Sequence, residues 1–450
     1  MSKDRVVIVG GDAAGMSAAS KIRREQPERE ILVLERTDFT SYSACGMPYF
    51  IGGLVENVDH LVARSPETFR DKYNIDVRTG HEVIAIDPER QQVAIRTRED
   101  EEVSEPYDQL LIATAACPFC PDVPGSHSRG IFGLSTLSSG IRVHQFLAEE
   151  KPRTAVVVGG GYIGLEMAEA LIRKGLNVSL VQHGPEVMGT LDPDMGALVS
   201  QALREAEVTL YLSETMTGFE TRDGRVTAVV TDRRTLPADV VILGMGVRPN
   251  SELAAAAGLD LGVKNGILVD DRMRTSASNI WAAGDCVATV HRLSGEPTYI
   301  ALGTVANKQG LVAGTNLAGG EARFPGVVGT AVSKICRVEV ARAGLQEKEL
   351  KKLDFEYATA TITAKTRAGY FPGSGKVTVK MLGEKGSGRL LGAQIVGLEG
   401  SAKRIDTVAT ALTAGMTVED VIDLDLSYAP PFSPVWDPVQ TAARQLVKQL

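Results

Sequence analysis

Residues 6–15 read VVIVGGDAAG, and residues 155–164 read AVVVGGGYIG. In each stretch a run of mostly β-branched residues ends in glycines. A helix-like segment follows, at 16–24 in the first copy and at 165–173 in the second, and a further apolar run completes each copy. Because β-branched runs favour strands, each copy predicts a strand, a glycine turn, a helix and a second strand. Such units build a parallel sheet with helices packed on its faces.

The glycines of the second copy have the spacing at which a dinucleotide pyrophosphate is held. A helix N-terminus offers free backbone N–H groups, and glycine lets the backbone approach the phosphates closely. Gly159, Gly161 and Gly164 match the pattern G-x-G-x-x-G in full. The alternative for one such loop is an ordinary turn between strand and helix, which the presence of two copies disfavours.

The first copy matches the same pattern less completely. Gly10 and Gly15 occupy its ends with Gly11 between them, but Asp12 occupies the middle position. Glu35 follows the second strand-like run of this copy, where a carboxylate can accept both ribose hydroxyls of an adenosine. We therefore expect a second dinucleotide at this turn.

The second copy ends in Gln182 and His183, where a ribose-binding acid is expected. Without the acid there is no charge repulsion against a 2′-phosphate, and His183 can help to hold one. These residues favour NADPH, or the use of both NADH and NADPH. The alternative is that Gln182 bonds the ribose hydroxyls.

Composition and charge exclude several classes of protein. A net charge of −8, from 48 basic and 56 acidic residues, argues against nucleic acid as a partner. The five cysteines are dispersed and odd in number, which fits free thiols in a reducing cytosol, so we expect a cytoplasmic protein. No apolar run is long enough for a signal peptide or a membrane span. The six histidines show no H-x-x-x-H spacing, and we expect no metal.

Three further segments carry a resemblance to a known family. The segment TSASNIWAAGD, at 275–285, resembles the second FAD motif of the flavin–disulfide reductases, in which the aspartate, here Asp285, bonds the ribityl chain. The segment GMGVRPN, at 244–250, resembles their crossing between the nicotinamide and FAD domains, and 301–314 resembles the helix that faces the flavin. The resemblance runs over almost the whole length and implies an oxidoreductase that binds FAD and takes hydride from NAD(P)H.

The resemblance also implies the fold. We expect an α/β protein with two Rossmann-like three-layer nucleotide-binding domains plus a C-terminal α+β dimerisation domain. The expected FAD-binding domain has two parts, 1–115 and 247–325, with the NAD(P)H-binding domain at 116–246 between them. The dimerisation domain is expected at 326–450, where no glycine fingerprint occurs.

The segment SYSACGMPY, at 41–49, places Cys45 just after the first ribose-binding run. In related reductases with a redox-active pair, a second cysteine follows five positions later, but here that position is Phe50. Cys45 therefore cannot close a local disulfide. It can form a mixed disulfide with a small thiol or cycle through sulfenic acid, with its thiolate favoured by a helix N-terminus or a nearby cation. The alternative is a buried structural cysteine.

The pattern around Cys45 resembles the single-cysteine branch of the FAD-dependent pyridine nucleotide-disulfide oxidoreductases. This branch holds coenzyme A-disulfide reductases, NADH oxidases and peroxidases, and polysulfide or persulfide reductases. The oxidases and peroxidases typically carry a histidine in the first glycine loop, and 10–15 contains none. The coenzyme A-disulfide reductases carry tyrosines in Y-[YF]-P-G and Y-A-P-P, matched here by Tyr370 and Tyr428. The resemblance implies that these tyrosines reach the cysteine of the partner subunit in a homodimer and bond the departing thiolate.

The first expectation is therefore a reductase of coenzyme A disulfide that works through a Cys45–S–S–CoA intermediate. The resemblance places substrate contacts at Ser41, Arg24 and Arg64, and arginine suits the phosphates of coenzyme A. For Arg24 the alternative is a solvated helix face. Three other functions stay open: a persulfide or polysulfide reductase, a water-forming NAD(P)H oxidase that uses sulfenic acid, and an FAD redox sensor or reductase of a protein partner.

One pair of cysteines lies outside the family pattern. Cys117 and Cys120 form a C-x-x-C after a strand-like run, and a structural or adventitious disulfide is favoured there over two free thiols. Cys286 and Cys336 are expected to be packed rather than reactive.

Overall fold

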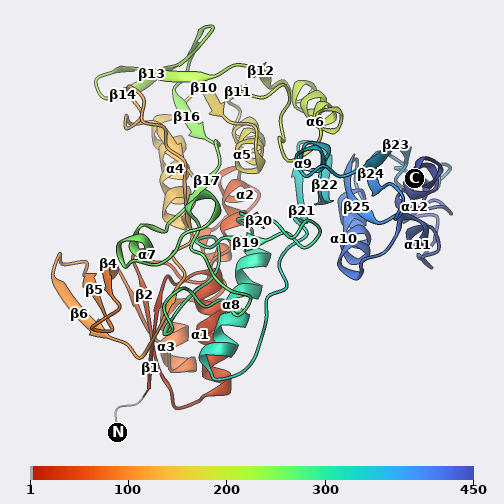
Figure 1. The fold of residues 1–450 in the computed structure, drawn as a ribbon. Coiled ribbons are helices and arrows are strands. Elements are labelled where there is room, and N and C mark those ends of the chain that lie inside the picture. Colours follow the sequence, from red (N-terminus) through yellow and green to blue (C-terminus); the bar gives the residue numbers. More distant parts are fainter. Residues whose placement is uncertain (1–3) are drawn as a thin grey trace.

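The computed structural model describes residues 4–450, so the first three residues of the expected FAD-binding domain lie outside the described residues. Its first large sheet has five parallel strands in the order β18-β7-β1-β2-β3 (Figure 1). The strands are β1 (Arg5–Val9), β2 (Glu30–Glu35), β3 (Asp76–Thr79), β7 (Gln109–Ile112) and β18 (Ile280–Ala282). Pairing of β18 with β7 returns the chain to this sheet after the second domain, which supports the two-part division that we propose for the FAD-binding domain.

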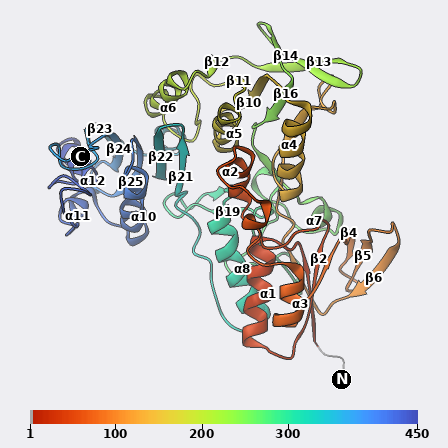
Figure 2. The same ribbon diagram turned by 180° about the vertical axis from the view of Figure 1, so that it is seen from behind.

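Helices α1 (Ala13–Glu25) and α8 (Gly303–Leu317) lie side by side against this sheet (Figures 1 and 2). Small residues allow the close approach: a Cβ on Gly310 would lie 2.3 Å from the Ala14 carbonyl oxygen, and one on Gly314 would lie 2.8 Å from Ala18 Cα. Helix α1, which follows the first glycine turn, is thereby held against α8, the helix that follows Asp285. The domain is completed by α2 (Met47–Ile51), α3 (Pro66–Tyr73), α7 (Glu252–Ala256), β19 (Thr289–Val290), β20 (Pro297–Thr298) and the sheet of β4 (Glu82–Asp87), β5 (Gln92–Arg96) and β6 (Glu102–Pro106).

The second large sheet is also parallel, in the order β12-β11-β10-β16-β9. Its central strand is fully apolar and buried after its first residue, as expected for a strand covered on both faces. The elements of this domain are β9 (Ile131–Gly133), α4 (Leu137–Glu150), β10 (Thr154–Val158), α5 (Tyr162–Arg173), β11 (Asn177–Gln182), α6 (Pro193–Glu205), β12 (Thr209–Leu212), β13 (Met216–Arg222), β14 (Arg225–Thr231), β15 (Thr235–Pro237) and β16 (Val240–Leu243). An antiparallel ribbon of β8 (Ala116–Pro118) and β17 (Val247–Pro249) joins the two nucleotide-type domains.

The C-terminal part is built on an antiparallel sheet in the order β21-β22-β25-β24-β23, and it lies to one side of the other two domains (Figures 1 and 2). Its elements are β21 (Ala331–Ile335), β22 (Val338–Gly344), α9 (Glu347–Lys352), β23 (Tyr357–Lys365), β24 (Lys376–Glu384), β25 (Leu390–Gly397), α10 (Ile405–Ala414), α11 (Val418–Ile422) and α12 (Pro438–Leu446). The predicted fold class, two Rossmann-like domains followed by an α+β domain, is confirmed.

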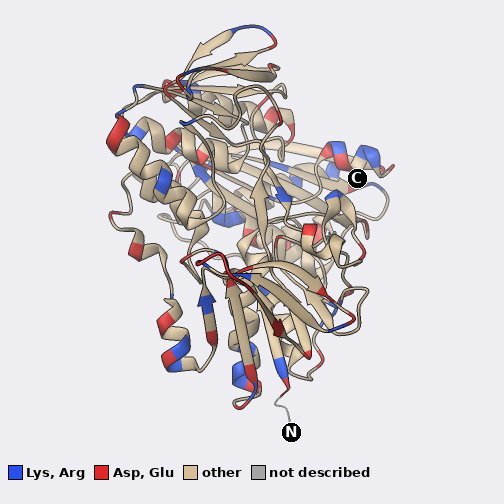
Figure 3. Cartoon of the chain, turned by 90° about the vertical axis from the view of Figure 1, so that its left-hand side faces the viewer, with Lys and Arg blue, Asp and Glu red and all other residues tan. Residues whose placement is uncertain are grey.

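Basic and acidic side chains are interspersed along the chain in the view of Figure 3. Among residues 4–450 there is no helix with the length and apolar character needed to cross a bilayer.

Candidate active site

The first glycine turn is closed so tightly that side chains are excluded at Gly10 and Gly15. Gly10 has φ +110°, and a Cβ there would lie 2.1 Å from the Ala113 carbonyl oxygen. A Cβ on Gly15 would lie 1.9 Å from the Gly10 carbonyl oxygen. Gly11 N donates to Glu35 Oε2 at 2.8 Å, so the predicted ribose-binding carboxylate also holds the turn. Since a carboxylate has about four acceptor sites, Glu35 keeps capacity for a ribose.

The second turn repeats this geometry. Gly159 has φ +102°, and a Cβ on Gly164 would lie 2.0 Å from the Gly159 carbonyl oxygen. Gly160 N donates to Gln182 Oε1 at 2.9 Å, the counterpart of the bond between Gly11 and Glu35. Gln182 thus closes its turn without a charge, and His183 beside it is exposed to solvent.

Asp285 lies three residues after the end of β18, and its carboxyl acts on Asp12 of the first turn. The Tyr299 hydroxyl donates to the Asp285 carbonyl oxygen at 2.7 Å, and burial raises the pKa of the Asp285 carboxyl to about 6. Its Oδ1 is enclosed and has no hydrogen-bond partner within residues 4–450. An enclosed acceptor without a donor, next to a turn in which Gly10 and Gly15 leave no room for side chains, fits a ligand that has both hydroxyls and a pyrophosphate, as FAD has.

Asp12 has a role that the sequence pattern did not reveal. It is the N-cap of α1, but its side chain makes no capping bond. Instead Asp12 Oδ1 accepts a hydrogen bond from Tyr42 N at 3.2 Å, which ties the glycine turn to the segment that contains Cys45. Burial, with smaller contributions from Glu35 and Asp285, raises the pKa of Asp12 from 3.8 to about 7, although the bond from Tyr42 opposes this shift.

Cys45 lies in a single helical turn, Ala44–Gly46, that leads into α2. Its thiol is free and its side chain is exposed. Desolvation raises the pKa of Cys45, and the carboxyls of Glu166, Asp285 and Asp12 raise it further. Within the described chain, no cation is among the groups that shift the pKa of Cys45, whose charged neighbours are acids, whereas a backbone hydrogen bond at the start of this turn lowers the pKa.

Phe50 takes the place of a second redox cysteine and has a packing role. It is buried and stacks on His144 of α4, with ring centroids 4.5 Å apart. A Cβ on Gly52 would lie 3.2 Å from Ala170 Cα in α5. The turn with Cys45 is thus held between the FAD-type domain and two helices of the NAD-type domain.

Glu166 is a further acid of the site that the sequence analysis missed. It projects from α5, and its Oε1 accepts a hydrogen bond from Ser333 Oγ of β21 at 2.7 Å. Burial raises its pKa, and its charge is the largest electrostatic contribution to the raised pKa of Cys45. A glutamate within an otherwise apolar helix face, YIGLEMA, was the available signal.

Tyr370 and Tyr428 lie together on the surface of the C-terminal domain. Tyr370 is 78% exposed and Tyr428 46% exposed. A hydrogen bond to Tyr370 raises the pKa of Tyr428. They belong to the loops between β23 and β24 and between α11 and α12 of the C-terminal domain, which lies to one side of α2 (Figures 1 and 2). Within one chain the structure therefore brings the two tyrosines to each other but not to Cys45.

Two of the three expected substrate contacts, Ser41 and Arg64, lie on adjacent segments, since Ala63 N donates to the Ser41 carbonyl oxygen at 2.9 Å, whereas Arg24 lies elsewhere. Arg24 lines a cavity of about 400 Å³ between α1 and α8, together with Lys21. Arg64 is outside that lining, and its guanidinium lies over the Tyr73 ring at 5.3 Å. Ser41 has φ +49°, and its backbone N donates to the Gly11 carbonyl oxygen.

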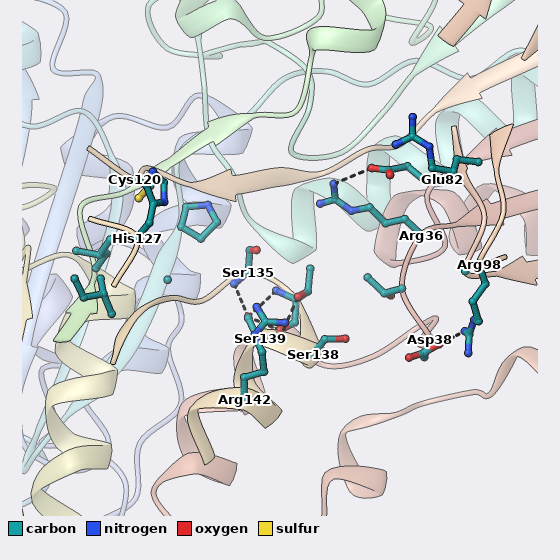
Figure 4. A pocket seen from close by; sticks show the side chains of 18 of the residues that line it. Arg36, Asp38, Glu82, Arg98, Cys120, His127, Ser135, Ser138, Ser139 and Arg142 are labelled. Atoms are coloured by element: carbon teal, nitrogen blue, oxygen red, sulfur yellow. Dashed lines mark hydrogen bonds and ion pairs between the residues drawn. The ribbon is translucent and has the colours of Figure 1, made fainter. Parts of the chain in front are cut away.

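A larger cavity, of about 950 Å³, opens between the two nucleotide-type domains (Figure 4). Arg36, which directly follows Glu35, lies at one side of it, and Cys120 and His127 lie at the other. Hydroxyl groups and Arg142 from the start of α4 line the space between them. The lining is basic and rich in hydroxyl groups, and it includes Arg36, the residue after Glu35. Such a lining suits the adenosine end of a nucleotide.

The disulfide favoured for Cys117 and Cys120 is wrong, because both thiols are free. Cys117 pairs with Arg248 in the ribbon of β8 and β17, and Arg248 Nε donates to its sulfur at 3.2 Å. Phe119 N continues the pairing by donating to the Gly246 carbonyl oxygen. Cys120 lies two residues beyond the end of β8 and lines the larger cavity with His127. Cys286 is buried as expected, and Cys336 is half-buried with a pKa raised by burial to about 11.

Comparisons with known proteins cover the whole described chain. The family model described as pyridine nucleotide-disulphide oxidoreductase matches residues 4–310, and the model for the dimerisation domain of that family matches residues 330–438. An NAD(P)H coenzyme A polysulfide/persulfide reductase of Pyrococcus horikoshii is 40% identical over 99% of this chain and 98% of its own length. A coenzyme A disulfide reductase of Staphylococcus aureus is 30% identical over 95% of this chain and 96% of its own. The solved structure of reduced Bacillus anthracis CoADR-RHD is 35% identical with a TM-score of 0.96, covering 100% of this chain and 81% of that one.

Proposed function

Because the chain belongs to the pyridine nucleotide-disulphide oxidoreductase family, we propose that it uses NAD(P)H to reduce coenzyme A disulfide through the single thiol of Cys45. The observation that carries this proposal is the exposed, free Cys45 beside Asp285, with a buried phenylalanine at the position of a second redox cysteine. An unpaired thiol at such a site can form a disulfide with a thiol from outside the chain.

Two sets of residues are proposed to hold the cofactors. Gly10, Gly11 and Gly15 with the start of α1 hold the FAD pyrophosphate, Glu35 holds its ribose, and Asp285 accepts a bond from its ribityl chain. Bound FAD supplies the redox step by carrying two electrons from the nicotinamide to sulfur. The NAD(P)H pyrophosphate lies on the second turn, Gly159, Gly161 and Gly164. The neutral Gln182 and the adjacent His183 favour NADPH, because neither repels a 2′-phosphate.

The sulfur chemistry begins when the Cys45 thiolate attacks one sulfur of the disulfide. The mixed disulfide Cys45–S–S–CoA forms, and one coenzyme A leaves as a thiolate that takes up a proton. Two electrons and a proton then cleave the mixed disulfide and release the second coenzyme A. Tyr370 and Tyr428 of the partner subunit donate hydrogen bonds to the first departing thiolate, since phenols are neutral donors at physiological pH.

A homodimer is part of this proposal. Beside the two tyrosines the C-terminal domain exposes the apolar side chains of Phe432, Val435 and Trp436, which are 78%, 68% and 47% exposed. A cluster of large apolar side chains at a surface favours association with another subunit.

The cavity with Lys21 and Arg24 supplies cations for the phosphates of coenzyme A, with Ser41 and Arg64 proposed as further contacts. The free cysteines support a cytoplasmic location.

A persulfide or polysulfide joined to coenzyme A is the second candidate substrate. The 40% identity to the Pyrococcus horikoshii reductase, above the 30% to the coenzyme A disulfide reductase, favours it. The same Cys45 thiolate would attack the sulfane sulfur, so the two candidates share every protein residue named above. A sulfenic acid oxidase is less favoured, since residues 10–15 contain no histidine.

The mass of the purified, unreduced protein, before and after a reducing agent, is the first experiment. A reducible adduct of coenzyme A mass on Cys45 supports the mixed disulfide. An adduct of one oxygen would instead support the oxidase, and addition of sulfur atoms alone would favour the persulfide substrate.

Replacement of the thiol tests the role of Cys45 directly. Cys45→Ser is expected to abolish reduction of coenzyme A disulfide, by at least 10⁴-fold, because serine cannot take part in thiol–disulfide exchange. FAD content, measured by absorbance, stays unchanged since no contact of the glycine turn is lost. Cys117→Ser, in the ribbon of β8 and β17, is the control and keeps full activity. Full turnover by Cys45→Ser would exclude the mechanism.

A further inference from the structure

The two glycine turns allow an internal comparison, because the second turn lies in a domain without a redox cysteine. In the first, Ser41 has φ +49° and its N–H donates to the Gly11 carbonyl oxygen at 3.0 Å. In the second, Met188 has φ +52° and its N–H donates to the Gly160 carbonyl oxygen at 2.7 Å. The segment after the second strand is thus attached to its turn in the same way in both domains.

The two turns differ at the residue that follows. The second turn has Gly161 there, and a Cβ on it would have one neighbour within 4 Å, the Gly244 carbonyl oxygen at 3.8 Å. The first turn has Asp12, whose Oδ1 accepts from Tyr42 N at 3.2 Å. Space for a side chain therefore exists in both turns, but only the turn next to Cys45 has a carboxyl that makes a second bond to the following segment.

Tyr42 connects this carboxyl to Cys45, three residues further along. Its amide is held by Asp12, and its hydroxyl accepts a hydrogen bond from the backbone of Leu137 at the start of α4. The segment is also fixed from its other side, where Ser43 N donates to the Leu61 carbonyl oxygen at 2.7 Å. Loss of the hydrogen bond between Tyr42 N and Asp12 would leave the Asp12 side chain without its bond to the segment of 41–45.

The charge of Asp12 also acts on the thiol. The groups that face Cys45 are the carboxyls of Glu166, Asp285 and Asp12, and each raises the pKa of Cys45. Glu35 and Asp285 face Asp12 itself. Because the pKa of Asp12 is about 7 and that of Cys45 is raised above its ordinary value, Asp12 is ionised throughout the range in which the thiol titrates.

We propose that Asp12 is a positioning residue for Cys45, because it fixes the segment of 41–45 on the first glycine turn through the Tyr42 amide. A consequence is that its carboxylate, held near the thiol, opposes ionisation of Cys45. The inference deepens the proposed function, since it assumes that the Cys45 thiol is the reacting group. Asp12 touches no substrate in this account and acts through Tyr42 and through its charge.

Asp12→Asn and Asp12→Ala separate the two effects in the full chain supplied with FAD. Asparagine keeps an oxygen acceptor for Tyr42 N but has no charge, whereas alanine has neither. The rate of Cys45 alkylation by iodoacetamide is measured against pH by mass spectrometry, and amide hydrogen exchange is measured over residues 41–45. Asp71→Asn, at an exposed carboxyl on α3, is the matched control.

Both variants are expected to lower the midpoint pH of alkylation, because the thiolate loses a negative neighbour. Only Asp12→Ala is expected to speed exchange of the 41–45 amides, by about tenfold for the loss of one hydrogen bond. The proposal is overturned if the midpoint stays at the wild-type value in Asp12→Asn, or if Asp12→Ala exchanges like the wild type. If Asp12→Ala does not fold, the midpoint of Asp12→Asn decides. Neither measurement needs turnover, so failure of the proposed substrate does not affect the result.

Discussion

Asp12 binds a proton more tightly in the folded chain than in the unfolded one, because burial raises its pKa from 3.8 to about 7. Between these two values the folded state holds a proton that the unfolded state has released, so stability falls as the pH rises from about 4 to about 7. Asp12→Asn removes this dependence. Relative to wild type, the variant should gain stability over that range, by at most about 4 kcal/mol. Urea unfolding of FAD-free protein at pH 5 and pH 8 measures the difference. An equal pH dependence in both proteins would contradict it.

At the scale of elements, the second glycine turn predicts different losses of stability for substitutions at two of its glycines, Gly164 and Gly161. A Cβ on Gly164 would lie 2.0 Å from the Gly159 carbonyl oxygen, a backbone atom that cannot move alone. Gly164→Ala should therefore destabilise the NAD-type domain by about 3 kcal/mol or more. A Cβ on Gly161 meets one atom at 3.8 Å, so Gly161→Ala should fold normally.

Gly161→Ala then separates an effect on the binding of NAD(P)H from an effect on folding. Because the backbone at 161 is expected to approach the NAD(P)H pyrophosphate, Gly161→Ala should raise KM for NAD(P)H about tenfold at unchanged melting temperature. Thermal unfolding and steady-state kinetics on both variants measure this. Equal melting temperatures for the two variants would show that the close approach at Gly164 does not matter.

The elements themselves were predictable because their signals are local. The expected helix over 16–24 is α1 at Ala13–Glu25, and the expected strand over 155–158 is β10 at Thr154–Val158. Periodicity and glycine spacing lie within one short segment, so they can be recognised without knowledge of the rest of the chain.

The residues that the sequence did not reveal depend on long-range contacts. The bond between Asp12 and Tyr42 spans 30 residues, and the bond between Glu166 and Ser333 spans 167. No local pattern encodes such pairs, which explains why both acids were missed. The disulfide expected from C-x-x-C was wrong because spacing alone does not specify extended backbone.

A partly buried group of charged side chains around Lys380 joins the C-terminal domain to the NAD-type domain. Lys380 of β24 lies 3.2 Å from Asp192 Oδ2, 2.9 Å from Asp194 Oδ1 and 2.6 Å from Glu347 Oε1. The side chains of Lys380 and Asp192 are 5% and 2% exposed. Asp192 and Asp194 lie at the start of α6 in the NAD-type domain, so this lysine joins the C-terminal domain to it.

Lys380→Met should cost about 3–5 kcal/mol, because it leaves a buried carboxylate without a cation. Lys403→Met is the control, since that side chain is 81% exposed and its pair with Asp406 contributes little. Urea unfolding followed by circular dichroism measures both. A double variant with Asp192→Asn should recover part of the loss, and its failure to do so would place the effect outside this pair.

At the scale of the whole molecule, we propose that each active site combines two chains. It follows from the separation of α2 from the surface that carries Tyr370 and Tyr428, and it is tested by co-expressing differently tagged subunits. When one subunit carries Cys45→Ser and the other carries Tyr370→Phe with Tyr428→Phe, the heterodimer keeps one complete site of two if the tyrosines act across the interface. When all three substitutions lie on one subunit beside a wild-type partner, neither site is complete. The first heterodimer should thus have about half of wild-type activity and the second close to none. Tyrosines acting within their own chain would reverse the two results, because the wild-type subunit alone would then be complete.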